Sequence, residues 1–228
     1  MNPNPVAAVI WDVDGTLVDT GELHFQAWVE LARELDKPFT RADFAATFGW
    51  RNPDIIPKLF GSQYTDRQVQ ELGDRKENLY REQAKKGVTL LPGVRKLLEG
   101  LDAAGFRQGV GSSAPRTNLE LILALTETTR FFPAVISMED TRLGKPNPDV
   151  FLLAAAKLNV PPERCLVIED APAGIQAARA GGMRSIGVTF VGHHDPKTLQ
   201  DAGADLVVPS LEPVGVEMIK ALLGEPEA

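Results

Sequence analysis

Two aspartates, separated by a single residue, stand directly after the first apolar run of the chain. Residues 6–11 are apolar, and Asp12 and Asp14 follow them. Ligands of parallel sheets bind at the carboxyl ends of the strands, so this position favours a functional site. One carboxylate of such a pair can act as a nucleophile or metal ligand while the other transfers a proton. A solvated Asp/Gly turn is the alternative. An EF-hand is excluded, because its first and last positions would hold Ile10 and Gly21.

Two serines follow a second strand-like run, residues 107–111. The letters from Gly109 to Ala114 fit the dinucleotide-binding pattern G-x-G-x-x-A. That interpretation is disfavoured because the match lies outside the first strand–helix unit, and the next acidic pair comes about thirty rather than about 20 positions later. Serine hydroxyls and free N–H groups before a helix can instead seat a phosphate. A simple helix cap is the alternative for Ser112 or Ser113.

A lysine and two adjacent carboxylates complete the set. Lys145 precedes Pro146, which cannot continue a helix and fixes an extended turn, so the ammonium can be held in one direction. Glu169 and Asp170 follow an apolar run that ends at Ile168, where both carboxylates can approach one cation. Taken singly, Lys145 is an ordinary surface lysine and Asp170 an ordinary helix cap.

Together these groups are the ones that phosphoryl transfer requires. Carboxylates hold Mg²⁺, hydroxyl and N–H groups seat phosphate oxygens, and a lysine offsets the charge that develops between nucleophile and phosphorus. One shared site explains all four motifs, whereas the alternatives need a separate explanation for each. The sequence therefore predicts a Mg²⁺-dependent phosphoryl-transfer site.

Short apolar runs alternate with segments of helical periodicity, and this pattern predicts the sheet that collects the motifs. The runs are apolar on both faces, as buried parallel strands are. The predicted strands are Val6–Trp11, Arg107–Gly111, Ala134–Ser137, Cys165–Ile168, Ser185–Phe190 and Leu206–Val208. The predicted helices between them are Val94–Ala104, Asn118–Leu125, Asp149–Asn159 and Ala173–Ala180. The fold class is α/β, a doubly wound parallel sheet with a Rossmann-like core.

Residues 18–87 lack the strand pattern and predict an inserted all-α domain. The first expected helix carries an apolar stripe from His24 through Trp28. The core is then discontinuous, formed by residues 1–17 and 88–228, and the two crossings between domains would act as hinges. The expected helices of the inserted domain are Glu22–Leu35, Arg41–Thr47, Pro53–Leu59 and Asp66–Lys86.

The four motifs, in this order, resemble those of the haloacid dehalogenase superfamily of aspartate-dependent phosphotransferases, in the subgroup with a helical cap inserted after the first strand. The resemblance covers nearly the whole chain. It implies that Asp12 forms an aspartyl-phosphate and that Asp14 is the general acid/base, with a backbone carbonyl that also ligates Mg²⁺. It further implies that Glu169 and Asp170 complete the metal site and that the transferred phosphate is held by Lys145 and the serines. The matching positions are Asp12-Val13-Asp14-Gly15-Thr16, Ser112, Lys145 and Glu169-Asp170.

Residues 19–28 resemble the β-phosphoglucomutase branch, in which the cap histidine, here His24, bonds the acid/base aspartate. A buried polar residue at the start of the Trp28 stripe is the alternative. The lysine of that branch's cap loop is absent from residues 48–52, and Arg51 falls one place early. A mutase needs a second, cap-borne phosphate site, for which Arg51 and Lys76 are the candidates.

The predicted function is Mg²⁺-dependent hydrolysis of a small phosphorylated metabolite such as a sugar phosphate. A β-phosphoglucomutase or related sugar phosphomutase is the alternative. A non-catalytic phosphate- or nucleotide-binding module is the alternative from another class.

The composition argues against nucleic-acid-binding, membrane-spanning and secreted proteins. The 228 residues include 24 Lys and Arg against 31 Asp and Glu, a formal net charge of −7, and no basic cluster, which argues against nucleic-acid binding. Pro3 and Pro5 interrupt the N-terminus and no apolar stretch approaches about 20 residues, so we expect neither a signal peptide nor a membrane span. A single cysteine, Cys165, excludes an intramolecular disulfide, so a cytoplasmic location is expected. Nothing indicates an obligate protein partner.

His193 and His194 lie in a Gly/Asp/Pro loop and are expected to be solvent-exposed.

Overall fold

The computed structural model describes residues 6–224, which contain a six-stranded parallel sheet; Pro3 and Pro5 lie outside the described residues. The strand order is β3-β2-β1-β4-β5-β6, so β1 lies between β2 and β4. The three strands predicted to carry site residues are therefore neighbours. The strands are β1 (Ala8–Trp11), β2 (Arg107–Gly111), β3 (Ala134–Ile136), β4 (Cys165–Glu169), β5 (Arg184–Val188) and β6 (Leu206–Val208).

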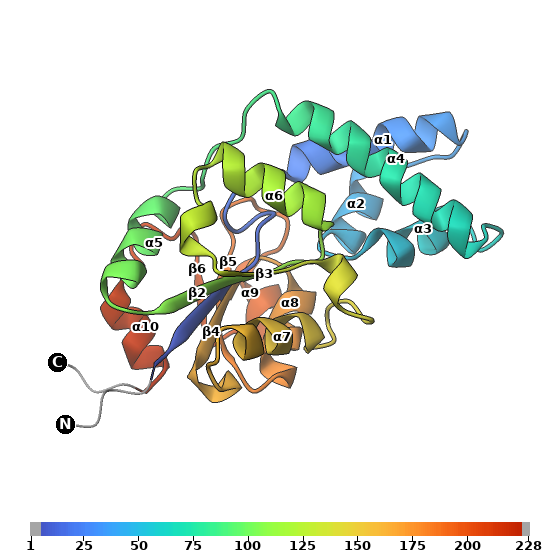
Figure 1. Cartoon of the computed structure of the whole chain (residues 1–228). Helices are drawn as coiled ribbons and strands as arrows, with labels where there is room; N and C mark the ends of the chain where they lie inside the picture. Colours follow the sequence, from blue (N-terminus) through green and yellow to red (C-terminus); the bar gives the residue numbers. More distant parts are fainter. Residues whose placement is uncertain (1–5, 225–228) are drawn as a thin grey trace.

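Helices cover both faces of the sheet (Figure 1). Val9 and Trp11 of β1 pack into one apolar cluster with α5 and α6, while Ala8 and Ile10 pack into another with α7 and α8. Burial on both sides explains why β1 is apolar at every position, and the predicted doubly wound α/β class is confirmed. These helices are α5 (Val94–Ala103), α6 (Arg116–Leu125), α7 (Asp149–Lys157) and α8 (Pro172–Ala180).

Two short helices were not predicted. They are α9 (Pro196–Ala202), which packs on α8, and α10 (Val216–Leu222), which packs on α5. Each has seven residues, and both follow the last predicted helix, Ala173–Ala180. Three short 3₁₀ turns, Thr129–Phe131, Met138–Asp140 and Pro162–Arg164, lie in loops. Within residues 6–224, no helix combines the length and the apolar character needed to cross a bilayer.

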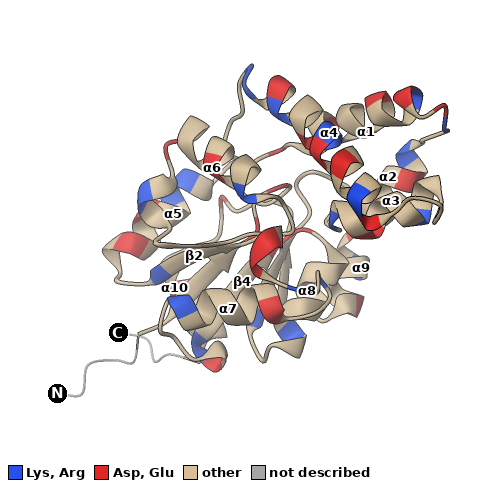
Figure 2. Cartoon of the chain, turned by 45° about the vertical axis from the view of Figure 1, so that its right-hand side comes forward, with Lys and Arg blue, Asp and Glu red and all other residues tan. Residues whose placement is uncertain are grey.

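Four further helices lie together beyond the carboxyl ends of the strands (Figure 1). They enclose an apolar cluster of their own around Trp28, Phe44 and Ile56. Acidic and basic residues are interspersed along their outer surfaces (Figure 2). Placing the domain boundaries at residues 17/18 and 87/88 stays a prediction. The helices are α1 (Gly21–Glu34), α2 (Arg41–Thr47), α3 (Asn52–Phe60) and α4 (Asp66–Ala84).

Candidate active site

Three strand ends and one loop bring the main sequence-predicted site residues together. Asp12 follows β1, Ser112 follows β2, and Glu169 is the last residue of β4. Lys145 reaches them from the loop before α7. Its Nζ donates hydrogen bonds to Asp12 Oδ1 at 2.6 Å and to Glu169 Oε1 at 2.7 Å. A carboxylate and a cation thus meet at the end of the central strands.

Lys145 is buried, with 2% of its side chain exposed, so its charge needs compensation nearby. Burial would lower its pKa, but the carboxylates of Asp12 and Glu169 raise that pKa above its usual value. Lys145 is therefore held as a cation against the Asp12 oxygen. The alternative interpretation of an ordinary surface lysine is wrong.

Asp12, Glu169 and Asp170 form a buried acidic cluster. Each offers one oxygen, and these oxygens all lie within 4.8 Å of one another. Asp170 Oδ2 is buried and has no hydrogen-bond partner among the described residues. Burial, with repulsion between the carboxylates, raises the pKa of Asp12 to about 7 and the pKa of Asp170 well above its usual value, although Lys145 acts against both shifts. A group of oxygens so short of positive charge fits a hard divalent cation such as Mg²⁺.

Glycine at position 15 allows Asp170 to approach the turn after β1. Gly15 has a φ of +86°, in the left-handed region, and a Cβ there would lie 2.0 Å from Asp170 Oδ2. Glu169 is fixed separately, because its Oε2 accepts a hydrogen bond from the Ala171 N–H at 2.6 Å. Ala171 occupies the N-cap of α8, and no side chain caps that helix. The helix-cap interpretation of Asp170 is therefore wrong.

Asp14 has surroundings opposite to those of Asp12. Its Oδ1 accepts hydrogen bonds from the Thr20 hydroxyl and, at 3.3 Å, from the Tyr80 hydroxyl. His24 Nε2 lies 3.2 Å from the same oxygen. Burial would raise the pKa of Asp14, but His24, with the Thr20 hydroxyl, lowers it to about 2. The structure therefore favours Asp14 as a carboxylate.

A chain of buried polar contacts fixes the orientation of His24. Lys76 Nζ lies 2.7 Å from His24 Nδ1. An ammonium can only donate, so Nδ1 accepts this bond and Nε2 carries the proton that faces Asp14. The His24 ring also stacks on Tyr80, with centroids 4.0 Å apart. His24 is thus a buried residue that directly contacts the acid/base candidate.

Glu77 connects this series of polar contacts to both the four helices α1–α4 and the helices on the sheet. Its Oε1 accepts hydrogen bonds from Lys76 Nζ at 2.9 Å and Asn52 Nδ2 at 2.7 Å. Its Oε2 accepts one from Asn118 Nδ2 at 2.6 Å, and Asn118 belongs to α6 on the sheet. Burial would raise the pKa of Glu77, but Lys76 and His24 lower it below its usual value.

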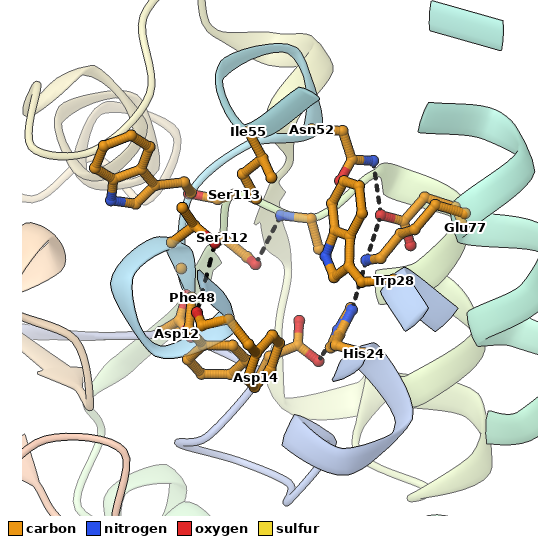
Figure 3. A pocket seen from close by; sticks show the side chains of 16 residues that line it. Asp12, Asp14, His24, Trp28, Phe48, Asn52, Ile55, Glu77, Ser112 and Ser113 are labelled. Carbon is orange, nitrogen blue, oxygen red and sulfur yellow. Dashed lines mark hydrogen bonds and ion pairs between the residues drawn. The ribbon is translucent and has the colours of Figure 1, made fainter. Parts of the chain in front are cut away.

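The two serines line the same cleft as Asp14 (Figure 3). Ser112 is buried, and its hydroxyl accepts a hydrogen bond from the Ala114 N–H at 3.1 Å. Helix α6 begins only at Arg116, and Pro115 occupies its N-cap without a side-chain bond. Neither serine caps that helix, so the helix-cap interpretation is wrong. Both hydroxyls line the cleft beside Asp12.

The cleft lies between the strand ends and the four helices (Figure 3). Its sheet side is polar, formed by Asp12, Asp14 and the serines. Its helical side carries five large apolar side chains, Trp28, Phe44, Phe48, Trp50 and Ile55, beside the polar residues His24, Thr47, Asn52, Lys76 and Glu77. Among the described residues that line it, Lys76 is the sole lysine or arginine, and Glu77 already compensates its charge.

The two candidates for a second phosphate site differ in position. Lys76 lines the cleft but is bonded to His24 and Glu77. Arg51 does not line the cleft; its guanidinium bonds Asp54 and the carbonyl oxygen of Arg142. Their predicted role in phosphate binding stays a prediction.

The expectation that His193 and His194 are solvent-exposed is wrong, because both are half-buried. The His193 ring lies against Phe48 and Phe44 of the helical side, with centroid distances of 4.6 and 5.6 Å. Gly21 lacks the Cβ that would collide with His193 Nε2. The loop after β5 thus contacts the helices above it.

Several residues of the site were not predicted from the sequence. Thr20, Tyr80 and Glu77 all bond directly to Asp14 or to the chain behind His24. A signal for them exists in α4, where buried positions recur three or four residues apart and include Lys76 and Glu77. Charged residues at the core positions of a helix are rare unless they are paired.

Comparison with known proteins agrees with this geometry. Residues 6–182 match the family model described as haloacid dehalogenase-like hydrolase. The chain belongs to this family. It is 36% identical over 219 residues to the β-phosphoglucomutase of Bacillus subtilis, with 93% of each chain covered. It is 32% identical over 188 residues to the fructose-1-phosphate phosphatase of Escherichia coli, which covers 81% of this chain and 97% of that protein.

A solved structure shares the whole architecture of this family member. The β-phosphoglucomutase of Clostridium difficile matches it with a TM-score of 0.86 at 26% identity, over 96% of this chain and 97% of that chain. The chain is therefore an enzyme with phosphohydrolase or phosphomutase activity. The alternative of a non-catalytic binding module is set aside.

Proposed function

We propose that this enzyme is a Mg²⁺-dependent phosphohydrolase of a small phosphorylated metabolite, such as a sugar phosphate. The observation that carries the proposal is the asymmetry of the cleft. The nucleophile candidate Asp12, which Lys145 contacts, and two serines line its sheet side, whereas the one lysine among the described residues of its helical side is already bonded to Glu77. Such a cleft suits one phosphate and a neutral leaving group. Sugar phosphates are suggested by the names of the relatives.

In the first step, an Asp12 carboxylate oxygen attacks phosphorus, and the bond from phosphorus to the ester oxygen breaks. Asp14 gives its proton to the leaving alcohol, and an aspartyl-phosphate remains on Asp12. In the second step, Asp14 takes a proton from water, the water oxygen attacks phosphorus, and inorganic phosphate leaves. The incoming phosphate adds like charge beside Asp14, which raises its pKa from about 2 toward the range of a proton donor.

The other polar groups would hold the phosphate and the metal. Lys145 offsets the charge of the transferring phosphoryl group, and Ser112 and Ser113 donate hydrogen bonds to its oxygens. Mg²⁺ would be held by Asp12, Glu169 and Asp170, with the backbone carbonyl of Asp14. When bound, Mg²⁺ neutralises the clustered carboxylates and the phosphate oxygens, which otherwise repel one another.

We also propose that residues 18–87 act as a cap that closes over the cleft. Closure excludes water and brings His24 against Asp14. A mutase is the second candidate, because the Bacillus subtilis relative carries that name. A mutase needs a second phosphate site, and both candidate cations already have other partners.

The two activities differ in whether phosphate is released. The test incubates the enzyme with Mg²⁺, β-glucose 1-phosphate and a trace of the 1,6-bisphosphate, and then a panel of other sugar phosphates. We expect the amount of free phosphate released to equal the amount of substrate consumed. Net glucose 6-phosphate without stoichiometric free phosphate would make the enzyme a mutase. Asp12→Asn should abolish turnover in either case, and Asp102→Asn, an exposed aspartate of α5, is the matched control.

A further inference from the structure

Arg51 joins the helical part of the molecule to the loop that carries Lys145. It is the residue before α3, and its Nη1 donates a hydrogen bond to the carbonyl oxygen of Arg142 at 3.0 Å. Its Nε bonds Asp54 Oδ2 at 3.0 Å, so α3 itself holds the guanidinium in place. The Arg51 side chain is only 12% exposed. This arginine thus bridges two segments about ninety residues apart.

Gly144 makes room for this contact. A Cβ at position 144 would lie 2.5 Å from Arg51 Nε and 3.0 Å from its Cδ. A side chain at position 144 would therefore force the arginine to shift. The next residue is Lys145, whose Nζ contacts Asp12 and Glu169. The loop from Arg142 to Lys145 is thus held by the helical part at one end and by the carboxylates at the other.

We propose that Arg51 is a positioning residue, which fixes the 142–145 loop when the helices are seated and so holds Lys145 against Asp12. Docking of the helices and assembly of the phosphate site then become one event. The proposal differs from the expectation that Arg51 binds a second phosphate. It rests on the proposed function only for its kinetic readout.

Three variants test the contact from both sides. Arg51→Met removes the guanidinium but keeps the length of the side chain. Gly144→Ala leaves the guanidinium intact and displaces it from the loop. Arg51→Lys retains one charged donor and should rescue part of the activity. Arg41→Met is the matched control, because Arg41 is exposed and pairs with Glu22 inside the helical part.

Kinetics should separate positioning from substrate binding. We expect Arg51→Met and Gly144→Ala each to lower kcat for a monophosphate about 10-fold or more, with a much smaller change in KM. The double variant should be little worse than either single one, because both break the same contact. Unchanged kcat in Gly144→Ala, or a loss in Arg51→Met confined to the KM of a bisphosphate, would overturn the proposal in favour of a phosphate ligand.

A second measurement does not depend on catalysis. Amide hydrogen exchange of a peptide spanning residues 141–150 should become faster in Arg51→Met and Gly144→Ala and stay unchanged in Arg41→Met. If the enzyme is a mutase, this result still tests the contact. Equal exchange in all variants would overturn the proposal whichever reaction the enzyme performs.

Discussion

The Asp170 carboxylate destabilises the folded protein, but it is well placed to bind a cation. Its Oδ2 is buried without a hydrogen-bond partner, and Glu169 and Asp12 repel it. A group whose pKa is raised on folding destabilises the folded state increasingly as pH rises above its usual value of 3.8. A bound cation would offset this destabilisation, because it neutralises the carboxylates that repel one another.

Replacing this carboxylate by its neutral isostere gives the first prediction. Without metal, at about pH 8, Asp170→Asn should raise the free energy of unfolding by about 1 to 3 kcal/mol, because it removes the carboxyl group whose raised pKa destabilises the folded state at this pH. Millimolar Mg²⁺ should stabilise the unsubstituted enzyme and leave the variant almost unchanged. Urea unfolding with EDTA or Mg²⁺ measures both effects, with Asp102→Asn as control. A less stable metal-free variant, or an unsubstituted enzyme that does not respond to Mg²⁺, would contradict the metal assignment.

The sequence predicted the strands and the residues at their ends because both depend on local patterns. Runs with apolar residues on both faces are typical of strands buried on two sides, and a parallel sheet then gathers their carboxyl ends. Nothing local relates His24 to Lys76, which lie 52 positions apart and meet only when α1 packs on α4. Arg51 likewise finds its carbonyl partner only after the helices are seated on the sheet. Apart from the contact of His24 with Asp14, which the family resemblance implied, the contacts that depend on docking between elements were the ones that the sequence did not reveal.

The loop after β5 provides a second contact between the sheet and the helices. His193 packs on Phe44 and Phe48, and burial lowers its pKa below the usual 6.5, while Asp19 opposes this shift and His194 and Arg41 add to it. Because protonation then favours the unfolded chain, this contact should be fully stabilising above about pH 6.5 and weaken as pH falls below it.

His193→Gln tests this pH dependence. The variant should be less stable than the unsubstituted enzyme at about pH 8, because it loses the ring contacts with α2. It should also lose less additional stability on acidification to about pH 5.5, because one of the groups that take up a proton on unfolding is gone. Thermal unfolding midpoints at the two pH values provide the comparison. Equal losses on acidification in both proteins would show that His193 does not contribute to the pH dependence.

Across the whole molecule, the helical part and the sheet share one buried polar network. Glu77 of α4 is 4% exposed and bonds residues of both parts, Lys76 within the helices and Asn118 on the sheet. Its pKa is lowered, because Lys76 and His24 outweigh the effect of burial. The network therefore stabilises the docked arrangement above about pH 4.5 and weakens as pH falls below that value.

The last prediction is a double-variant cycle on Lys76 and Glu77. Glu77→Gln should reduce the free energy of unfolding by about 3 to 5 kcal/mol, because Lys76 stays buried without its carboxylate. Lys76→Met should also destabilise, since Glu77 then keeps only its two amide partners. The combined variant should lose less than the sum of the two, by about 0.5 to 3 kcal/mol. Urea unfolding of the four proteins measures this coupling. On the same helix, Arg67 and Glu71 form an exposed ion pair, and Glu71→Gln should cost at most about 1 kcal/mol. If the buried pair proves additive, or no costlier to break than this exposed pair, the ion pair at the centre of the network does not stabilise the fold.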